Sequence, residues 1–515
     1  MTQYDVIIAG GGITGAGVAR DCALRGLKVL LVERFDMSTG ATGRNHGLLH
    51  SGARYAVTDH ESAKECIAEN KILRSIAPHC IDPTGGLFIT LPDDDLNYQA
   101  TFVEACKAAG IDAEIIDPRE AIAMEPSANR EMIGAVKVPD ASVDPFRLCA
   151  SNMLDAKLHG ADILLYTEVT GFIIEGDRVE GVKTRNRKTG EELEFRARIT
   201  VNSAGIWGAS LLEKAGITVG MFPSKGALLI FAHRVNRMVL NRCRKPANAD
   251  ILVPGNTVSI IGTTSTRVPL EECDNPQVTP DEVDLLIKEG VLLSPTLSET
   301  RILRAFAGVR PLVSSDNDPS GRSISRGAVC LDHAQRDGME GIVTITGGKL
   351  TTYRLMAEMA TDMVCKKLGV HKHCETAWTP LPGAEGHSFK EIADTIWRTP
   401  SNIPEEKDIY SDALICECEN ISVGELDAAV DHLGARSLVD LRRRTRMGMG
   451  TCQGELCACR AARILSRKLE SGEKAMEDLR SFMAERWKGI YPIAWGDALR
   501  EAEYTQWVYK HVLGI

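Results

Sequence analysis

Residues 4–34, YDVIIAGGGITGAGVARDCALRGLKVLLVER, constrain the fold of this chain more than any other stretch. The apolar run Val6–Ala9 is typical of a parallel strand that is buried on both faces. A helix is predicted to start near Ile13, and a second strand leads to Glu33. Between the first strand and the helix lie three glycines in GxGxxG spacing: Gly10, Gly12 and Gly15. This order of elements predicts a Rossmann-type dinucleotide-binding unit.

Each part of this unit has its own physical task. Gly10 allows the tight turn, Gly12 lets a pyrophosphate approach the backbone, and Gly15 lets the helix pack against the strand. The phosphate charge then lies at the positive end of the helix. Glu33 follows Gly15 by 18 residues, where a carboxylate accepts hydrogen bonds from a ribose diol. A glycine-rich turn without a ligand is the alternative, and the complete series of elements disfavours it.

The segments that follow favour FAD over NAD as the dinucleotide. Residues 38–56, STGATGRNHGLLHSGARYA, are rich in small residues and show no helical period, so they can run along a cofactor that extends beyond its pyrophosphate. Strand-like pieces end at Ala204-Gly205 and at Gly347-Gly348, and both can return to the same site, since ligands gather at the carboxyl ends of parallel strands. The predicted cofactor-binding residues are Gly10, Gly12, Ile13, Thr14, Gly15, Glu33, Arg34, Thr42, Gly43, His46, Gly47, Leu48, Val169, Ala204, Gly205, Gly348, Lys349, Leu350 and Thr351.

Three arginines indicate an anionic substrate. Arg54 lies in HSGARY, Arg310 follows a small-residue strand end, and Arg326 begins another strand. A guanidinium group binds phosphate or carboxylate through two parallel hydrogen bonds, so convergent arginines select an anion. Taken singly, each arginine is more often a surface or salt-bridge residue.

Two further residues are candidates for the surroundings of a flavin. His46 and His50 are four apart, as zinc ligands can be, but no HExxH motif surrounds them and the segment is not helical, so zinc is rejected there. His50 is interpreted as lining the flavin cavity, with a packed core histidine as the equal alternative. Lys349 would place a cation near flavin N1/O2 and stabilise the reduced ring, with a solvated lysine as the alternative.

Composition and charge exclude several classes of function. The formal charge of −10 over 515 residues implies no broad basic face, which argues against nucleic-acid binding. The N-terminus MTQYDVIIAGGG lacks the pattern of a signal peptide, and no run approaches the roughly 18 apolar residues of a membrane span. The 15 cysteines therefore do not predict a disulfide framework, and the ten scattered ones are interpreted as small buried residues.

The five remaining cysteines are crowded near the C-terminus: Cys416, Cys418, Cys452, Cys457 and Cys459. Zinc would be satisfied by four thiolates, but C-x-C is tighter than the spacing usual in structural zinc sites. A redox disulfide would need only two thiols. An iron–sulfur cluster takes four, and a flavin donor makes an electron acceptor useful, so the cluster is favoured over zinc. The first four are the predicted metal ligands, and Cys459 is a surplus thiol interpreted as packing.

The surroundings of these cysteines leave two questions open. Four arginines just upstream can offset the charge of a cluster, dock an acidic partner or form a solvated helix face: Arg442, Arg443, Arg444 and Arg446. The last segment holds three of the six tryptophans, which indicates either an interface or packing back onto the rest of the chain.

The chain divides into four predicted regions. Residues 160–345 are rich in strand patterns, which indicates an antiparallel substrate sheet interleaved with the cofactor domain. From about residue 372, proline, glycine and acidic residues predict a linker with a short helix. The predicted limits are 1–371 for the FAD-dependent oxidoreductase (FAD-binding parts about 1–80, 145–215 and 330–371; substrate parts about 81–144 and 216–329), 372–410 for the linker, 411–468 for the [2Fe–2S] domain and 469–515 for a C-terminal helical extension.

Several motifs together carry a resemblance that covers essentially the whole chain. The order GGGITGAG, LLHSGARYAV, GVRPLV, SRG and GGKLTTYRLMAE resembles FAD-dependent glycerol-3-phosphate dehydrogenases. With the cysteine-rich tail, the chain is most similar to the large catalytic subunits of the anaerobic bacterial enzymes. The spacing C-x-C-x33-C-x4-C is similar to the small helical [2Fe–2S] domain called BFD-like, after bacterioferritin-associated ferredoxin.

The resemblance implies a fold and a reaction. The fold would be α/β, with a Rossmann-type FAD-binding domain interleaved with an antiparallel-sheet substrate domain (DAAO/GR2-like) and a small all-helical C-terminal iron–sulfur domain. The enzyme would oxidise sn-glycerol 3-phosphate to dihydroxyacetone phosphate by hydride transfer to flavin N5. Electrons would leave through the [2Fe–2S] cluster to partner subunits and then to quinone, the partners being a second flavin subunit and an iron–sulfur membrane-anchor subunit. The chain itself would be cytoplasmic and peripheral on the inner membrane.

The resemblance also implies roles for residues at matching positions. Arg54, Arg310 and Arg326 would hold the substrate or its phosphate, and His50 and Lys349 would lie near the isoalloxazine ring. The aerobic relatives carry an acid after IGTT, where this chain has Ser265, so that position has no assigned role and the base stays open, with His50 as the leading candidate.

Two other functions remain as alternatives at the level of sequence. One is an FAD-dependent amine or hydroxy-acid dehydrogenase with the same tail, in which the arginines would grip a carboxylate. The other is a redox sensor or scaffold with a structural flavin and a zinc-binding tail.

Overall fold

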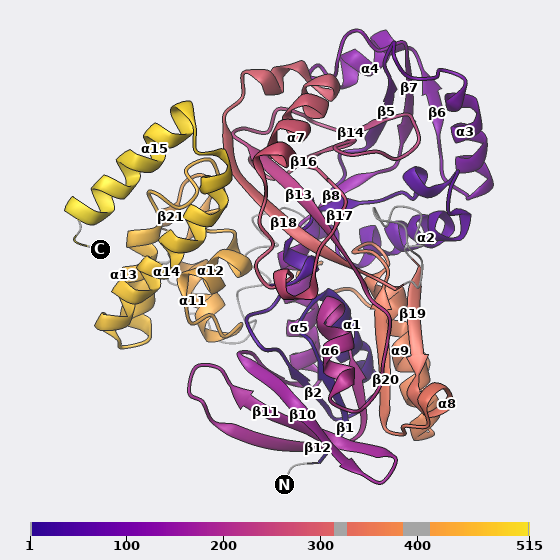
Figure 1. The fold of residues 1–515 in the computed structure, drawn as a ribbon, viewed down its shortest axis with the longest axis vertical. Coiled ribbons are helices and arrows are strands. Elements are labelled where there is room, and N and C mark those ends of the chain that lie inside the picture. The colour runs from indigo at the N-terminus through magenta and orange to yellow at the C-terminus, as the bar shows by residue number, and fades with distance from the viewer. Residues whose placement is uncertain (1–2, 314–326, 385–412, 513, 515) are drawn as a thin grey trace, which may run out of the picture.

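The computed structural model describes residues 3–313, 327–384, 413–512 and 514. Figure 1 shows a lower unit built on a sheet with helices beside it, an upper unit crossed by long strands, and a helical unit, yellow and orange, at the side of both. These are called the lower unit, the upper unit and the tail unit (residues 413–512). Segments far apart in the chain alternate between the lower and upper units.

A parallel sheet forms the centre of the lower unit. Its strand β2 is buried along its whole length, because layers of structure cover both faces. In β1 the side chains alternate: Val6 and Ile8 pack against helices, whereas Ile7 and Ala9 pack against the opposite layer. The parallel strands across the sheet are β9 (Asp162–Leu164), β2 (Val29–Val32), β1 (Gln3–Ala9), β12 (Glu192–Asn202) and β20 (Ile342–Gly347).

Helices cover one face of this sheet and a meander of strands covers the other. The helical layer consists of α1 (Ile13–Leu24), α5 (Pro145–Leu158) and α9 (Tyr353–Leu368), with α1 between the other two. The opposite layer and the edge consist of β10 (Thr167–Glu175), β11 (Arg178–Asn186), α6 (Gly208–Glu213), β19 (Ala328–Asp332) and α8 (His333–Asp337). This three-layer α/β arrangement confirms the predicted Rossmann-type unit.

The upper unit contains a nine-stranded sheet. Its longest strands, β13 and β18, pair from Phe222 opposite Leu312 to Phe231 opposite Ile302. In order across the sheet, its strands are β18 (Ile302–Leu312) and β17 (Thr266–Arg267), both paired with β13 (Phe222–Phe231), then β16 (Ser259–Gly262), β15 (Ile251–Pro254), β14 (Val239–Arg242), β5 (Gly86–Thr90), β7 (Gly134–Val138) and β6 (Glu114–Ile116).

One strand pair corrects the prediction of an antiparallel sheet. β14 and β5 run parallel, from Val239 opposite Gly86 to Arg242 opposite Ile89. These strands come from segments about 150 residues apart, so no hairpin turn forces them to run antiparallel. All other pairs in this sheet are antiparallel.

The remaining elements of the two units lie around these sheets. A small three-stranded sheet of β3 (Leu48–Leu49), β8 (Ala141–Val143) and β4 (Ile81–Asp82) joins segments that lead into both units. Helix α7 begins with a capping box, in which Thr279 and Glu282 satisfy each other's backbone N–H groups. The helices of the upper unit are α2 (His60–Ile76), α3 (Tyr98–Ala108), α4 (Pro118–Met124) and α7 (Pro280–Leu293).

The tail unit is largely helical, but the prediction of an all-helical domain is wrong in one respect. A short antiparallel pair, β21 and β22, encloses the C-x-C loop, where the chain must reverse direction and Asn420 takes a left-handed conformation (φ 56°). The elements are β21 (Leu414–Cys416), β22 (Ile421–Ser422), α11 (Val423–Asp431), α12 (Leu438–Thr445), α13 (Ala458–Lys468), α14 (Gly472–Ile490) and α15 (Gly496–Trp507). Across the described ranges, every helix is too short or too polar to cross a membrane.

Ion pairs connect the tail unit to the lower unit. Asp36 accepts two hydrogen bonds from Arg444, at 2.6 and 2.7 Å, and one from Arg443 at 3.0 Å. Arg446 pairs with Asp144 at 3.2 Å, and Tyr166 donates to Asp440. Three of the four tail arginines are therefore docking residues within the chain, which decides between the alternatives that the sequence left open.

The segment that leads toward the tail lies against the lower unit as far as the structure describes it. Residues 372–384 form no helix, and the carbonyl of Thr379 accepts a hydrogen bond from Arg20 at 2.7 Å. The rest of the predicted linker with its short helix, residues 385–410, lies outside the described residues.

Candidate functional site

A cavity of about 440 Å³ runs along the carboxyl ends of the parallel strands and continues to the β13–β18 ladder. It is called the first cavity. At one end it is lined by Gly10 and Glu33, and at the other by Arg310 and Lys349. Its position agrees with the rule that ligands bind outside the carboxyl ends of strands in open α/β sheets.

The first end has the features of a dinucleotide site. Gly10 has φ 117°, and a Cβ atom there would lie 2.7 Å from the carbonyl oxygen of Ser203, so the turn needs glycine. Gly12 is the N-cap of α1 without a side-chain cap, and the first turn of the helix holds no acidic residue. The N–H of Ile13 donates to the Thr42 hydroxyl at 3.0 Å, and the lack of a capping or acidic side chain in the first turn of the helix leaves the rest of its positive end available to a phosphate.

Glu33 is held rigidly at the edge of this end. Its carboxylate accepts hydrogen bonds from the N–H groups of Gly11 at 2.6 Å and Phe35 at 2.9 Å. Burial raises its pKa against the lowering effect of these hydrogen bonds. Nearby, the Arg34 guanidinium lies 4.4 Å from the Trp207 ring centroid. Trp207 also lines the cavity, and no sequence motif pointed to it.

Most of the predicted cofactor residues line the first cavity, and four do not: Gly15, Gly43, Gly47 and Thr351. These four residues pack behind the residues that line the cavity. A Cβ atom on any of the three glycines would collide with a backbone carbonyl. The Thr351 hydroxyl accepts a hydrogen bond from the backbone N–H of His50 at 3.2 Å. The elongated cavity and its donor groups fit an FAD molecule.

Arg310 lies at the far end on β18 and is bonded to two neighbouring segments. Its guanidinium donates to the hydroxyls of Ser224, at 3.3 Å, and Thr263, and to the carbonyl of Thr264 at 3.1 Å. Across the ladder, a Cβ atom on Gly226 would lie 2.6 Å from Arg310 Nη2, so only glycine leaves room for the guanidinium.

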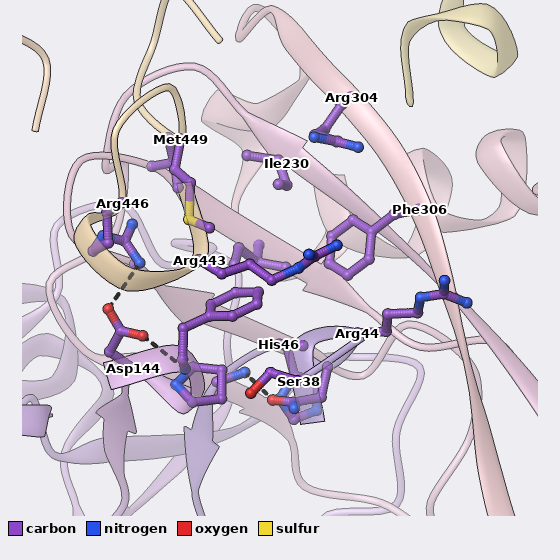
Figure 2. A pocket seen from close by; sticks show the side chains of 18 of the residues that line it. Ser38, Arg44, His46, Asp144, Ile230, Arg304, Phe306, Arg443, Arg446 and Met449 are labelled. Carbon is purple, nitrogen blue, oxygen red and sulfur yellow. Dashed lines mark hydrogen bonds and ion pairs between the residues drawn. The ribbon is translucent and has the colours of Figure 1, made fainter. Parts of the chain in front are cut away.

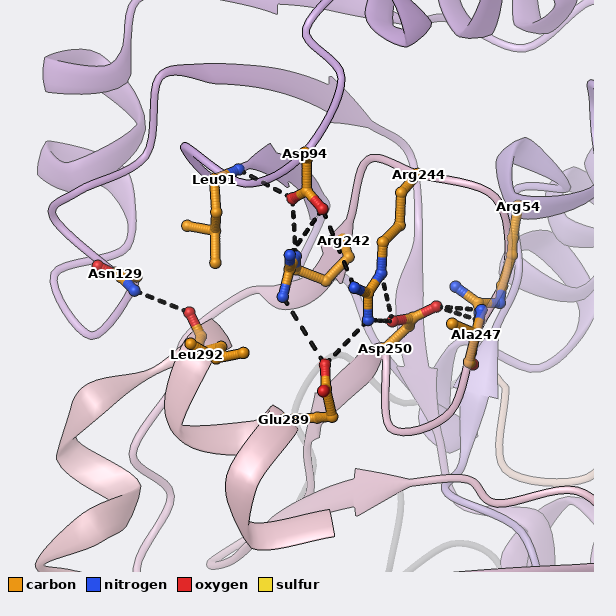
Figure 3. A network of polar contacts seen from close by, with 10 residues as sticks. All are labelled: Arg54, Leu91, Asp94, Asn129, Arg242, Arg244, Ala247, Asp250, Glu289 and Leu292. Atoms are coloured by element: carbon orange, nitrogen blue, oxygen red, sulfur yellow. Dashed lines mark hydrogen bonds and ion pairs between the residues drawn. The ribbon is translucent and has the colours of Figure 1, made fainter. Parts of the chain in front are cut away.

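Arg54 reaches the same cavity from a different segment and is oriented by a buried carboxylate. Its Nη2 donates to Asp250 Oδ2 at 3.0 Å, while Asp250 Oδ1 accepts from Arg244 at 2.7 Å. Figure 3 shows how this network continues to Arg242 and Asp94, which are 2.7 Å apart. The second nitrogen, Arg54 Nη1, is buried without a hydrogen-bond partner among the described residues. One side of the guanidinium is thus fixed, and the other can bind an anion.

His50, Tyr55 and Lys349 meet beside the arginines. The His50 ring centroid lies 5.3 Å from that of Tyr55, and Lys349 Nζ lies 4.9 Å from the Tyr55 centroid. All three residues line the first cavity together with Arg54 and Arg310. Arg326, the third predicted arginine, lies outside the described residues. Asp250 and Tyr55 were missed by sequence reasoning, because no motif marks a residue whose task is to orient or separate others.

The tail unit brings the four predicted cysteine ligands together as two pairs. Cys416 interacts with Cys457, and Cys418 with Cys452, while electrostatic interactions connect the two pairs. A hydrogen bond from Cys457, together with the backbone N–H groups of Gly448 and Glu419, lowers the pKa of Cys416 to about 6. Such hydrogen bonds to sulfur tune iron–sulfur clusters.

This arrangement fits a binuclear cluster better than a single ion. Among the described residues, no three acidic, histidine or cysteine side chains converge as ligands of one metal ion. Two separate thiol pairs suit two irons with two cysteines each. A Cβ atom on Gly450 would lie 2.4 Å from Cys418 Cβ, so the loop needs glycine beside the ligands. Cys459 interacts with Tyr509 instead, consistent with its interpretation as a packing residue.

Comparisons with known proteins match both parts of the chain. A family model described as FAD dependent oxidoreductase matches residues 5–354, and one described as BFD-like [2Fe-2S] binding domain matches residues 414–467. The chain is 59% identical to the A-subunit of the anaerobic glycerol-3-phosphate dehydrogenase of Escherichia coli K12, covering 99% of this chain and 97% of that protein. It is 42% identical to the A1-subunit from Haloferax volcanii, covering 99% and 89%.

A solved structure supports the fold over nearly the same length. The glycerol-3-phosphate dehydrogenase from Bacillus halodurans, complexed with FAD, superposes with a TM-score of 0.73 at 22% identity. The match covers 96% of this chain and 97% of that one.

Proposed function

Because this chain belongs to the family of anaerobic glycerol-3-phosphate dehydrogenase A-subunits, we propose that its first cavity oxidises sn-glycerol 3-phosphate to dihydroxyacetone phosphate. The observation that carries the proposal is the convergence of Arg54 and Arg310 on the far end of that cavity. Two guanidinium groups from different segments suit a phosphate dianion, which presents several oxygens in different directions.

The arginines bind and orient the substrate. The hydrogen bond to Asp250 fixes the orientation of the Arg54 guanidinium. The hydrogen bond to Ser224 on β13 does the same for Arg310. The phosphate is bound away from the reacting carbon, and its binding energy orients that carbon for reaction. Loss of a phosphate contact therefore lowers turnover as well as binding. Bound FAD supplies the hydride acceptor.

We propose that His50 accepts the proton of the secondary hydroxyl of the substrate. The residue is 9% exposed, and its backbone N–H donates to the Thr351 hydroxyl, which fixes its position beside Tyr55. Lys349 places positive charge at the same end of the cavity, where negative charge develops during reduction. Arg326 is proposed as a further phosphate contact on the basis of the family motif SRG.

The tail unit is proposed to carry electrons away through a [2Fe–2S] cluster held by Cys416, Cys418, Cys452 and Cys457. The relatives are named as single subunits of a larger enzyme, so this chain works together with partner chains. We propose that the partners are a second flavin-containing subunit, which receives the electrons, followed by an iron–sulfur membrane-anchor subunit that leads to quinone. We propose accordingly that the chain lies on the cytoplasmic face of the inner membrane, held there by these partners.

Exposed aromatic residues on the tail unit support a partner at this side. Trp487, Tyr491, Trp495 and Trp507 are all exposed on α14, α15 and the turn between them. Large aromatic side chains are enriched at protein interfaces.

The function is tested on the full chain purified without oxygen. Glycerol 3-phosphate should bleach the flavin absorbance, while glycine and simple 2-hydroxy acids should leave it unchanged. Iron and acid-labile sulfide should be present in equal amounts without zinc. Bleaching by a carboxylate substrate alone would instead identify an amine or hydroxy-acid dehydrogenase. Zinc in place of iron would contradict the proposed electron transfer through a cluster.

A further inference from the structure

A second cavity, of about 540 Å³, lies where the three units meet. It shares Thr39, Arg44, Asn45, His46 and Asp274 with the first cavity, so two short stretches of chain separate the two. On its other side it is lined by tail residues, among them Arg442 and Met449. The Arg442 guanidinium is close enough to Cys457 to interact with it electrostatically. The second cavity therefore lies between the flavin site and the cysteine site.

Cationic side chains enter this cavity from all three units: Arg44, Arg304, Arg442, Arg443, Arg446 and Lys488. Arg443 and Arg446 are neutralised by the docking carboxylates, and Lys488 pairs with Glu485 at 2.7 Å. The remaining arginines, Arg44, Arg304 and Arg442, form no ion pair within the part of the chain that the structure describes. Figure 2 shows Arg44, Arg304 and Arg443 reaching the cavity from different elements.

Two of these arginines are half-buried, and each has a buried Nε atom whose unsatisfied N–H favours a compensating anion. The Nε atoms of Arg304 and Arg442 are inaccessible to solvent and have no hydrogen-bond partner among the described residues. Burial lowers the pKa of both, and the charges of Arg304 and Arg443 lower that of Arg442 further. A buried, unpaired cation is costly unless an opposite charge accompanies it. Glu485 acts on all three unpaired arginines and is already bonded to Lys488. Asp274 also acts on Arg44, and it pairs with Arg34.

The rest of the lining is apolar and partly aromatic. Phe306 lies beside Arg443, as Figure 2 shows, and Phe146, Ile230 and Met449 also line the cavity. Ligand sites of a few hundred cubic ångströms typically combine apolar walls with a few charged groups that fix orientation. A lone inorganic ion would leave most of this space unfilled. Flat rings stack on phenylalanine and on guanidinium planes.

We propose that the second cavity binds an aromatic phosphate ester of mononucleotide size. Its phosphate lies among Arg44, Arg304 and Arg442, and its ring lies against Phe306 and Phe146. Adenine nucleotides and flavin mononucleotide share this chemistry. A ligand at this place would lie between the two redox sites. Flavin mononucleotide could carry electrons there, whereas an adenine nucleotide could only have a structural role.

The site is tested by extraction and by binding to the FAD-containing full chain. Denaturing the freshly purified protein should release a second aromatic phosphate beside FAD. After high-salt dialysis, AMP and flavin mononucleotide are titrated separately by calorimetry, with inorganic phosphate as a third probe. At least one aromatic phosphate should bind one site per chain more tightly than inorganic phosphate. Tighter binding by AMP would indicate a structural nucleotide, and tighter binding by flavin mononucleotide a redox ligand.

Variants separate a binding role from a structural one. Arg304→Gln and Arg442→Gln should each weaken the aromatic phosphate by about tenfold or more, since a charge-assisted hydrogen bond is lost. Without ligand, their melting temperatures should stay equal or rise, because repulsion between the arginines is relieved. The control Arg185→Gln, which removes an exposed pair with Glu192, should change neither quantity.

Three results would overturn the proposal. These are failure of the extract to yield a second phosphate together with failure of both aromatic probes to bind, unchanged affinity in both arginine variants, and equal affinity for inorganic phosphate and the aromatic probes. None of them depends on glycerol 3-phosphate oxidation, so the proposed reaction and this site can fail independently.

Discussion

At the scale of single residues, the first cavity shows how a buried carboxylate can prepare an arginine for an anion. Asp250 is fully buried and accepts hydrogen bonds from both Arg54 and Arg244. It satisfies one side of the Arg54 guanidinium and leaves Nη1 without a partner among the described residues. A guanidinium that is already ordered loses less entropy when it binds phosphate.

Removing Arg310 should damage catalysis more than cofactor binding. A hydrogen bond to a charged group contributes about 1.5–3 kcal/mol, so Arg310→Ala should lower kcat/KM for glycerol 3-phosphate by about 10- to 100-fold. Arg310→Lys should recover only part, since lysine cannot form the paired contacts. Steady-state kinetics and the flavin spectrum measure both effects. Normal kinetics with FAD retained would remove Arg310 from the substrate site.

Asp250→Asn should disturb the substrate site through Arg54. The variant leaves Arg54 less constrained, so we expect KM to rise and kcat to fall together, with kcat/KM lower by about tenfold. Asp94→Asn is the matched control, because Asp94 pairs with Arg242 in the same network without touching Arg54. Both variants should melt at lower temperature, but only Asp250→Asn should change the kinetics. A kinetic effect of equal size in both would mean that Asp250 acts through stability alone.

At the scale of elements, helix α12 connects the tail unit to the flavin-binding unit. Arg443 and Arg444 lie in its last turn and both pair with Asp36. Burial by itself would raise the pKa of Asp36, but the attraction and hydrogen bonds of Arg444 and Arg443 together outweigh it, and the pKa is lowered. The helix therefore holds the cysteine site at a fixed position beside the first cavity.

The docking of α12 should weaken in acid. A carboxyl whose pKa is lowered by folding stabilises the folded state fully above its ordinary pKa of about 3.9, and this stabilisation is lost as pH falls through the lowered value. Asp36→Asn should remove this stabilisation already at neutral pH, and we expect faster hydrogen exchange of the backbone amides in α12. Glu417→Gln, which removes an exposed pair with Arg460, is the control. Equal protection of α12 in both variants would contradict the docking role.

At the scale of the whole molecule, the two redox sites occupy different units joined by ion pairs. The first cavity belongs to the lower and upper units, and all four predicted cysteine ligands belong to the tail. Because the ligand pairs lie in a unit with its own hydrophobic core, reduction of the flavin and onward transfer are separable steps.

Cys457→Ser should separate these steps. Substrate should still bleach the flavin, but iron content should fall and electron delivery to an added quinone through the partner subunits should be lost. Cys459→Ser should retain iron and electron delivery, since Cys459 interacts with Tyr509 rather than with the four ligands. Iron analysis and turnover with and without quinone measure both. Loss of the cluster in Cys459→Ser would reverse the assignment of the surplus thiol.

Local sequence determined the dinucleotide unit and predicted the thiol ligands. The glycine turn, the buried strands and Glu33 form one contiguous stretch, in which each residue's task follows from backbone geometry and chain distance. The cysteines likewise carry their chemistry in their spacing. Short-range physics therefore suffices for these parts, and the structure places nearly all of the predicted cofactor residues around one cavity.

Only the tertiary structure decided which distant groups meet. The Asp250–Arg54 pair, the parallel pairing of β14 with β5, the docking of the tail arginines on Asp36 and the cationic second cavity all join segments far apart in the chain. A lone Asp or Arg carries no sequence mark of its partner, because burial and charge compensation depend on what the fold brings beside it. The sequence thus identified the redox groups, and the packing of the three units decided how they are connected.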